Sequence, residues 1–520
     1  MEIVDNRAVL IKTRSPEKYA IIPKSKVVAE HPGGGYTVAV FWGLDEMRVL
    51  RNLGVKDAPS PIKRNYDWPG RYEPMGHQIE TAAFMTMHRR CFCFNEQGTG
   101  KTLSALWAAD YLMNRGEVRR VLVICPLSTM QSVWVGDINN SIIHRSAIVA
   151  HHSDALRRIE MIQGNYEFVI SNYEGIELIA RAINNDGRFD LIICDEANAY
   201  KNTQTDRWKA LASIVHPQTY LWMMTGTPAA QSPVDAYGLA KLVNPNGVPR
   251  FQTAWRDKVM RTFNKFKWAP QEDAKETVNE ALQPAIRFTK AQCMDLPPVV
   301  TEVRNVAMTA QQLKYYKLIK EQMLAQLAGT TITAVNAGVV VNKLLQISAG
   351  AAYADDKDTI VFDSMPRLKA LKEIIEGTNR KVLVFALFRS CIETIVEYLD
   401  KQGIVNAQIH GDVNQTKRGQ IINDFQNSEE VRVLVMQPYA TAHGITLTAA
   451  DTVVFYGPLM SVEMYLQCIA RSDRKGQTSD KVTVFHIQSS PVEIRLFKAM
   501  AAKVDDQALL ISMFESEMKI

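Results

Sequence analysis

Hydrophobic residues along this chain form short runs, and the spacing of the runs predicts the kind of structure that each region adopts. Residues 1 to about 65 contain three β-type runs, at 8–13, 19–23 and 36–42, separated by Ser-Pro and by His31-Pro-Gly-Gly-Gly35. This pattern predicts a small β-rich domain, with Gly33–Gly35 as a hairpin turn because no Lys-Ser/Thr helix start follows it. We favour a packing role for this domain over a grip on DNA or a partner.

The rhythm changes after about residue 75. Five apolar runs, ending near residues 94, 126, 172, 196 and 226, alternate with helix-length segments, and five more follow after about residue 365. Alternation of this kind predicts parallel sheets with helices on both faces, so we expect an α/β protein with two doubly wound lobes in tandem.

These patterns divide the chain into five predicted regions. The proline-rich stretch around residues 57–74 is a linker, and 311–328 and 339–350 are clear helical segments. The last region is an amphipathic helix that we expect to brace one lobe. The boundaries are 1–65 for the β-rich domain, 66–245 for lobe 1, 246–362 for a mostly helical linker, 363–490 for lobe 2 and 491–520 for the brace.

The amino-acid composition indicates the kind of protein and its cellular compartment rather than its chemical activity. Hydrophobic residues make up 47% of the 520, which excludes wholesale disorder, and a net charge of +5 does not by itself indicate a nucleic-acid partner. No apolar run approaches the ~20 residues of a membrane span, and the first residues lack a signal-peptide pattern. Seven cysteines without C-x-x-C spacing suit a reducing compartment, so we expect a cytoplasmic protein, in a bacterium or a virus-infected host.

The sharpest local signal is the run Asn95-Glu-Gln-Gly-Thr-Gly-Lys-Thr102, which lies between the strand at 91–94 and the helix at 103–113. Glycines in such a loop let backbone N–H groups wrap around phosphates, and the helix N-terminus favours their charge. Lys101 would reach the β- and γ-phosphates and Thr102 would hold Mg²⁺. The sequence therefore predicts an ATP site with Mg²⁺, formed by Gln97, Gly98, Thr99, Gly100, Lys101 and Thr102, although Asn95 takes the place of the usual first glycine.

A carboxylate pair follows a second apolar strand. Asp195 is placed to hold Mg²⁺, and Glu196 to orient and deprotonate the attacking water. Near the other end of the chain, Arg471 and Arg474 are three residues apart, so they can share one helical face and project toward a γ-phosphate on the other lobe. An alternative is that both arginines form surface ion pairs.

Taken in order, these motifs resemble the Swi/Snf-related branch of the superfamily-two helicase-like ATPases, over about residues 72 to 490. The matching segments are Gln78, the phosphate loop, Pro126–Met130 with Trp134, Asp195–Asn198 with Lys201-Asn202, Thr225–Pro228, Arg287 with Lys290, Leu296–Pro298, Gly444–Asp451 and Gln467–Gln477. The sequence departs from the branch at Asn95, at Asn198 in place of histidine, and at Thr441–His443.

The resemblance implies RecA-like lobes and further roles for individual residues. It implies that Gln78 contacts adenine, that Gly444, Asp451 and Gln467 complete the nucleotide site, and that Thr225 and Thr227 couple hydrolysis to movement. It also implies nucleic-acid contacts at strand ends of both lobes, which suit phosphates rather than bases. These contacts are Leu127, Ser128, Thr129, Ser171, Asn172 and Tyr173 on lobe 1, and Phe388, Arg389, Gln437 and Thr446 on lobe 2.

A separate run of basic and aromatic residues, from Trp255 through Arg256, Lys258, Arg261, Phe263 and Lys265 to Trp268, could clamp a nucleic acid. A helical surface with its aromatic side chains packed inward explains the same pattern, and we favour that interpretation.

Together these features predict a monomeric motor that hydrolyses ATP on nucleic acid. Duplex or branched DNA, bound without sequence preference, is the expected partner, in replication, repair or recombination; protein partners are unknown. One alternative is a helicase that separates strands or migrates branches at forks, or acts on RNA. Another is a nucleic-acid-binding scaffold with an idle nucleotide site, against which the set Lys101, Glu196 and Arg474 argues.

Overall fold

The strands between residues 90 and 224 carry apolar side chains that point in turn to one side of their sheet and to the other. Their parallel sheet therefore has two buried faces. The computed structural model describes residues 1–226, 232–264, 267–293, 297–327, 334–353, 359–441, 445–474 and 476–502. The chain divides into a first unit, residues 1–229 with 233–293, and a second unit, residues 230–232 with 294–520, which are considered separately.

The sheet of the first unit has the order β13-β5-β10-β9-β6-β8-β7, with every pairing parallel. On β5, Cys91 and Cys93 face one core while Phe92 faces the other. The strands are β5 (Arg90–Cys93), β6 (Arg120–Ile124), β7 (Ala147–Val149), β8 (Phe168–Ser171), β9 (Phe189–Cys194), β10 (Tyr220–Met224) and β13 (Ala285–Ile286).

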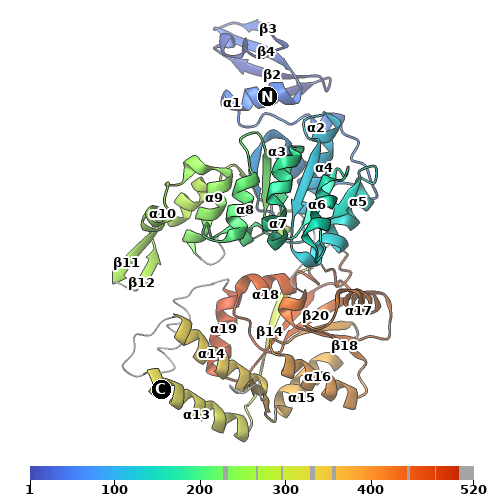
Figure 1. Ribbon diagram of the computed structural model, residues 1–520, viewed down its shortest axis with the longest axis vertical. Helices are drawn as coiled ribbons and strands as arrows, with labels where there is room; N and C mark the ends of the chain where they lie inside the picture. Colours follow the sequence, from blue (N-terminus) through green and yellow to red (C-terminus); the bar gives the residue numbers. More distant parts are fainter. Residues whose placement is uncertain are drawn as a thin grey trace. The chain divides into compact units, whose positions relative to one another are not determined.

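Helices cover both faces of this sheet, as the alternation of apolar runs predicts (Figure 1). One face carries α3 (Gly76–Met87), α4 (Lys101–Asn114) and α5 (Gly136–Ser141). The other carries α6 (Ala155–Gln163), α7 (Tyr173–Asp186), α8 (Asp206–Ile214), α9 (Ala236–Val243), α10 (Gln252–Val259) and α11 (Ala274–Ala281). Because all strands run the same way, their carboxyl ends meet at one edge, where ligands of such sheets bind.

The second unit repeats this architecture, with sheet order β14-β21-β20-β17-β19-β18 and parallel pairings throughout. The strands are β14 (Val299–Asn305), β17 (Lys381–Phe385), β18 (Asn406–Ile409), β19 (Val433–Met436), β20 (Ala450–Phe455) and β21 (Val482–Gln488). Helices α15 (Met365–Glu376) and α16 (Arg389–Lys401) cover one face, and α17 (Gln415–Asn427), α18 (Val462–Ile469) and α19 (Pro491–Ala501) the other. The prediction of two doubly wound lobes is confirmed.

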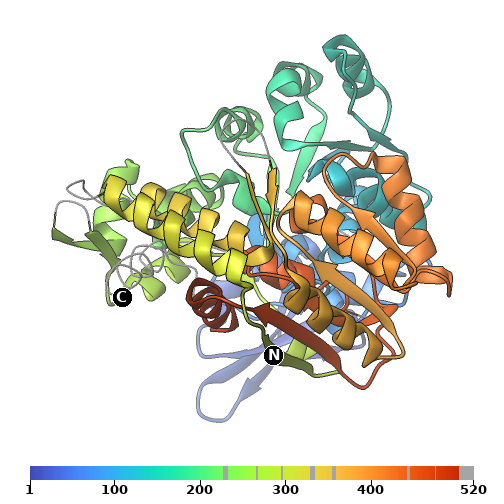
Figure 2. The same cartoon turned by 90° about the horizontal axis from the view of Figure 1, so that it is seen from below.

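Helices α13 (Ala310–Leu327) and α14 (Ala334–Ala349), drawn in yellow, lie side by side in the second unit (Figure 2). Their apolar side chains share a core with Val492 and Leu496 of α19. Residues 503–520 of the predicted brace lie outside the described residues. A short β15–β16 hairpin (Ala351–Tyr353, Thr359–Val361) follows α14.

The N-terminal domain is a four-stranded antiparallel sheet, β1 (Glu2–Val4), β2 (Ala8–Thr13), β3 (Ser25–His31) and β4 (Gly35–Phe41), with α1 (Leu44–Asn52) against one face. The hairpin turn is confirmed, because Gly33 and Gly34 have φ values of +99° and +83° between β3 and β4. The predicted strand at 19–23 is wrong. A 3₁₀ turn begins at Pro16, and Tyr19 and Ile22, three residues apart, point inward instead.

The structure also differs from the predicted linker of 246–362. Strand β13 belongs to the sheet of the first unit and β14 to that of the second, so the division falls between residues 293 and 294. Strands β11 (Met260–Asn264) and β12 (Lys267–Pro270) pair antiparallel in this region, where the sequence predicts mostly helix. Two short helices are α2 (Ile62–Asn65) and α12 (Lys290–Cys293).

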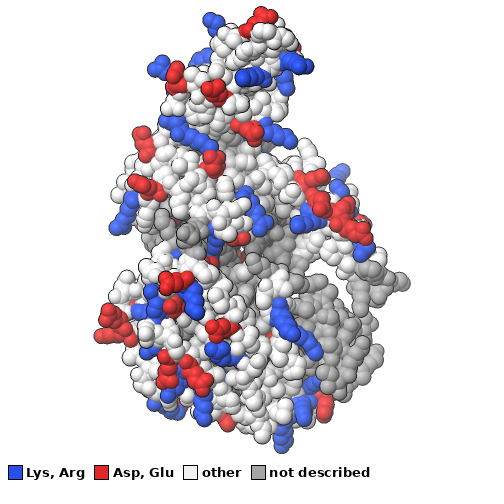
Figure 3. Space-filling view, turned by 180° about the vertical axis from the view of Figure 1, so that it is seen from behind, with Lys and Arg blue, Asp and Glu red and all other residues white. Residues whose placement is uncertain are grey.

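Charged side chains of both signs are spread over the face shown in Figure 3. Lysine and arginine alternate with aspartate and glutamate over the face shown in Figure 3, in keeping with the net charge of +5. Among the described residues no helix is long and apolar enough to cross a bilayer.

One buried ion pair holds the second lobe together. The Arg367 guanidinium on α15 donates to both carboxylate oxygens of Glu493 at 2.8 Å, and also to the carbonyls of Tyr456 and Ile487. Glu493 in turn accepts the Ser489 and Ser490 N–H groups at the start of α19. The pair therefore joins α15, β20, β21 and α19.

We expect Glu493→Gln to lower the free energy of unfolding by about 3 kcal/mol, because it leaves the buried Arg367 charge uncompensated. Urea unfolding followed by far-ultraviolet circular dichroism measures this. All eight tryptophans lie within residues 1–293, so tryptophan fluorescence reports the first unit separately. Glu397→Gln, at the exposed pair with Lys401, is the matched control and should leave both transitions unchanged. Equal transitions for Glu493→Gln and the unmodified protein would contradict this role.

Candidate nucleotide site

The loop between β5 and α4 has the backbone conformation that phosphate binding requires. Gly98 and Gly100 have φ values of +82° and +78°, in the left-handed region that favours glycine. A Cβ on Gly100 would overlap the amide nitrogen of Gln78. Helix α4 begins directly after, at Lys101, so the N–H groups of its first turn face the same end of the sheet. This cradle fits a phosphate group.

Helix α3 packs against this loop through two side chains. The Gln78 amide donates to the Gly100 carbonyl at 3.5 Å, while its oxygen accepts the Met75 N–H at 2.9 Å. A ring nitrogen of His77 lies 2.7 Å from the carbonyl oxygen of Thr99. Both side chains are buried. Gln78 therefore lies at the loop as predicted. His77 was not predicted, because its partner is 22 residues away and no sequence pattern links the two.

The acidic pair lies at the end of β9, next to the loop. The Asp195 carboxylate accepts the indole N–H of Trp134 at 3.1 Å, and burial raises its pKa above the ordinary value while nearby Lys101 opposes that rise. Lys101 itself donates to the carbonyls of Asn95 and Glu96, at 2.9 and 3.2 Å. The structure thus brings Lys101 and Asp195 together, which the sequence predicts.

Glu196 has a strained backbone, with a φ of +47° that a side chain of this size rarely adopts. It precedes the 3₁₀ turn η4 (Ala197–Tyr200), which includes Asn198. The Tyr173 hydroxyl donates to the Asp195 carbonyl at 2.7 Å, and it lies 3.4 Å from that of Glu196. Strain held in place by neighbouring contacts is typical of functional sites.

Thr225 comes directly after β10, the strand next to β9 in the sheet. Its N–H donates to the Cys93 carbonyl on β5 at 3.0 Å, its side chain is buried, and Gly226 lies against Gln97. The predicted coupling residue Thr225 thus adjoins the loop, whereas Thr227 lies outside the described residues.

Among the described residues, no group of three or more His, Cys, Asp and Glu side chains is arranged to hold a metal by itself. Thr102 and Asp195 suit Mg²⁺ nonetheless, because Mg²⁺ on a nucleotide takes one or two protein oxygens and fills its other positions with phosphate and water.

The predicted nucleic-acid contacts of this lobe differ in exposure. Leu127 in the 3₁₀ turn η2 (Leu127–Thr129) is 47% exposed, and Ser128 is half-buried. Thr129, Ser171 and Asn172 are buried, and the Thr129 hydroxyl donates to the Pro126 carbonyl. Trp134, in the π-helical turn η3 (Met130–Val135), was noted only as part of a motif, and its bond to Asp195 has no signal in the sequence.

In the second unit, Arg471 and Arg474 converge on one loop. Both donate to the Ile445 carbonyl, at 3.4 and 3.0 Å, and Arg474 also donates to the Thr446 hydroxyl at 2.9 Å. The prediction that they share a helical face is wrong, because α18 ends at Ile469. They are brought together by the turn that follows.

The other predicted residues of this unit surround that turn or lie at strand ends. Gln467 is buried on α18, and Asp451 at the start of β20 accepts the Ser479 hydroxyl at 3.3 Å. Arg389 is exposed and pairs with Glu393 and Asp412. Of the remaining predicted contacts, Phe388 is half-buried directly before α16, and Gln437 donates to the Leu387 carbonyl. Gly444 lies outside the described residues.

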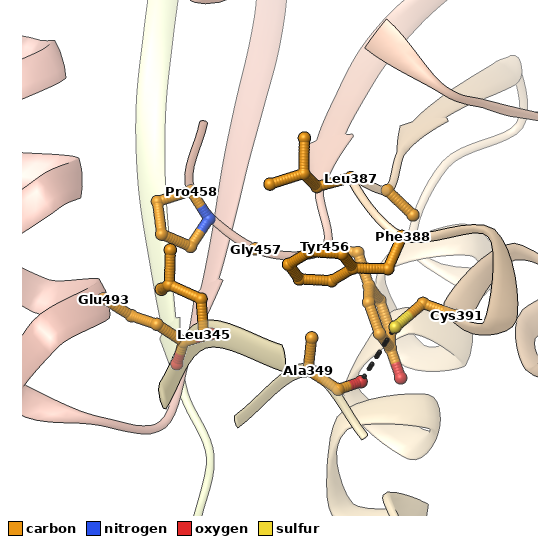
Figure 4. Close-up of a pocket in the computed structure, with 10 residues that line it drawn as sticks. Leu345, Ala349, Leu387, Phe388, Cys391, Tyr456, Gly457, Pro458 and Glu493 are labelled. Atoms are coloured by element: carbon orange, nitrogen blue, oxygen red, sulfur yellow. Dashed lines mark hydrogen bonds between the residues drawn. The ribbon is translucent and has the colours of Figure 1, made fainter. Parts of the chain in front are cut away.

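The turn of this lobe that corresponds to the phosphate loop is apolar. Between β17 and α16 the chain reads Ala386-Leu387-Phe388, and these residues line a small pocket with Leu345 and Tyr456 (Figure 4). The charged residue in its lining, Glu493, is neutralised by Arg367. Such a lining does not suit a triphosphate.

Near the hairpin of the first unit, Trp255 is buried, and the Arg256 guanidinium lies 4.5 Å from the ring centre of Trp268. Inward packing of Trp255 agrees with the favoured interpretation. Trp268 is 37% exposed, and residues 265–266 lie outside the described residues.

Comparison with known proteins places these features in a family. The SNF2-related domain matches residues 40–349, and the helicase conserved C-terminal domain matches residues 366–476. "Putative protein p41" of Acyrthosiphon pisum secondary endosymbiont phage 1 is 24% identical over 75% of this chain and 86% of its own length.

Two eukaryotic relatives are longer. The mouse "Chromodomain-helicase-DNA-binding protein 1-like" is 24% identical over 88% of this chain, and Arabidopsis thaliana "ATP-dependent DNA helicase DDM1" is 23% identical over 80%. The matches span only 53% and 58% of those proteins.

Among solved structures, the Sulfolobus solfataricus SWI2/SNF2 ATPase core in complex with dsDNA is similar at 20% identity, with a TM-score of 0.43, over 84% of this chain and 92% of that one. Since the SNF2-related domain alone accounts for more than half of the 520 residues and a helicase C-terminal domain follows it, the chain belongs to the SNF2-related family of helicase-like ATPases.

Proposed function

We propose that this protein hydrolyses ATP with Mg²⁺ when it binds DNA, and uses the energy to move along the duplex and remodel what lies ahead. The observation that carries the proposal is the grouping of Lys101, Asp195 and Thr225 around one glycine-wound loop at the carboxyl edge of the first sheet. The names of the relatives support DNA as the partner.

Each residue of the first lobe then has a distinct task. Lys101 exchanges its carbonyl partners for phosphate oxygens, and Gln78 holds the loop from α3 and faces the adenine. Thr102 and Asp195 hold Mg²⁺, which neutralises charge on the phosphates when bound. Glu196 orients the attacking water and accepts its proton. Its strained backbone lies directly after Asp195 in the chain.

The second lobe contributes arginines rather than a second nucleotide site. Arg471 and Arg474 can exchange the Ile445 carbonyl for γ-phosphate oxygens of a nucleotide on the first lobe, which gives stronger, charge-assisted hydrogen bonds. Alternating closure and opening of two lobes that both contact the DNA backbone would then move the protein along it. We propose Ser128, Arg389 and Thr446 among those contacts.

Lys101→Ala and Glu196→Gln should each lower DNA-stimulated phosphate release at least about 100-fold, because they remove the phosphate-binding charge and the general base. A coupled phosphate-release assay, with and without duplex DNA, measures this. Circular dichroism should show an unchanged fold. Normal turnover in either variant would refute the role assigned to that residue.

Arg474→Ala should lower hydrolysis about 1,000-fold while ATP affinity changes little, since an arginine finger acts mainly in the transition state. Binding of a fluorescent ATP analogue and steady-state hydrolysis separate the two effects. Lys401→Ala, on the exposed end of α16, serves as the control and should change neither. If ATP binding and ATP hydrolysis fell by the same factor, Arg474 would not act as an arginine finger.

A translocase should displace the third strand of a DNA triplex, with ATP, without separating the strands of a forked duplex. Both assays use fluorescently labelled strands, and Glu196→Gln is the inactive control. Unwinding of the fork with the triplex intact would favour the helicase alternative over the translocase.

A further inference from the structure

The segment that leads out of the first unit is attached to the phosphate loop itself. Along and beyond β13, the carbonyls of Pro284, Ile286 and Phe288 accept the N–H groups of Phe92, Phe94 and Glu96, at 2.8–2.9 Å. The pairing with β5 therefore continues past the end of the strand and into the loop. Six residues beyond Phe288, at residue 294, the chain enters the second unit.

Side chains of the loop complete this attachment. The Asn95 side-chain oxygen accepts the Phe288 N–H at 2.9 Å, and the Glu96 carboxylate accepts the Lys290 N–H at 3.0 Å. The Asn95 amide also donates to the Thr81 hydroxyl on α3 at 2.8 Å. Asn95 is fully buried. It thus joins the loop, the exit segment 284–293 and the helix that carries Gln78.

Only an amide of this length satisfies both partners of Asn95. Aspartate has no hydrogen to donate, and Thr81 already donates its own hydroxyl hydrogen to the His77 carbonyl at 2.7 Å. Glycine, the usual residue at this place in such loops, has no side chain to reach either partner. The residue at which the loop departs from the usual pattern therefore has a structural task.

The same two residues hold the phosphate-binding lysine. Lys101 donates to the main-chain carbonyls of Asn95 and Glu96, and an ammonium that moves to a phosphate must give up at least part of this bonding. Nucleotide binding then changes the hydrogen bonds of the residues that anchor the exit segment.

We propose that Asn95 and Glu96 are positioning residues that couple nucleotide binding in the loop to the exit segment 284–293, and through it to movement of the second lobe. This inference rests on the proposed function, because it assumes that the loop binds ATP. The two residues act on the linkage between lobes and contact no reacting atom.

The test compares Asn95→Gly and Glu96→Ala with the unmodified sequence. Donor and acceptor dyes are attached to cysteines introduced at the exposed positions Gln204 and Glu430, one in each unit, in a Cys293→Ser background because the other described cysteines are buried. Energy transfer is titrated with the ADP–beryllium fluoride complex, and affinity for a duplex is measured with and without it.

We expect the unmodified protein to change its energy transfer on binding the analogue. Asn95→Gly should bind the analogue with similar affinity, since glycine is the usual loop residue, but the factor by which the analogue changes DNA affinity should fall about tenfold. Glu96→Ala, which loses one bond, should lower it about fivefold. Thr289→Ala is the control, because that hydroxyl bonds to Gln292 within the exit segment, and it should behave as the unmodified protein.

The outcomes separate this inference from the proposed function. If the unmodified protein does not bind the analogue, the proposed function fails. If it binds and both variants respond like it at equal occupancy, the coupling role of Asn95 and Glu96 is overturned. Should Asn95→Gly not fold, as judged by tryptophan fluorescence, Glu96→Ala decides the question alone.

Discussion

The position of the Lys101 ammonium is the constraint on which the first lobe depends. A half-buried cation near a half-buried carboxylate requires partners for both, and main-chain carbonyls of the loop serve Lys101 while the Trp134 indole serves Asp195. The left-handed glycines Gly98 and Gly100 then give the loop a tight path that lets α4 begin at Lys101. The phosphate loop, the acidic strand end and the β10 end are thereby fixed to one another before any ligand binds.

Residues predicted to contact nucleic acid are tied into this same arrangement. Tyr173 begins α7, just after β8, where the backbone of a bound nucleic acid would lie. Its hydroxyl nevertheless donates to the carbonyl of Asp195. A shift of α7 would therefore disturb the acidic pair directly. This gives a short physical route by which DNA could change hydrolysis, without a long chain of intermediates.

The sequence predicted the parts of the fold that depend on local pattern. Buried parallel strands such as β10 and β19 are unbroken apolar runs, and the phosphate loop combines glycines with Lys101 between a strand and a helix, so both were found. The division between the two units at residue 293 was not predicted, because β13 has only two residues and joins the sheet by pairing with β5, which is distant in the sequence. Likewise, the spacing of Arg471 and Arg474 suggested a helix that in fact ends earlier, and the partners of Asn95 lie 14 and 193 residues away.

The two lobes share a topology but not a chemistry, and this difference is what the proposal of one nucleotide serving both lobes requires. Where the first lobe has glycines and Lys101, the second has Ala386-Leu387-Phe388 against an apolar pocket (Figure 4). Its cations lie on another turn instead, where Arg471 and Arg474 donate to a main-chain carbonyl, as Lys101 does in the first lobe. A neutral carbonyl satisfies a cation at modest strength, and a phosphate oxygen replaces it with a net gain. In the proposed mechanism, each lobe therefore carries cations that would gain a better partner in a triphosphate, and that shared preference would favour closure of the lobes.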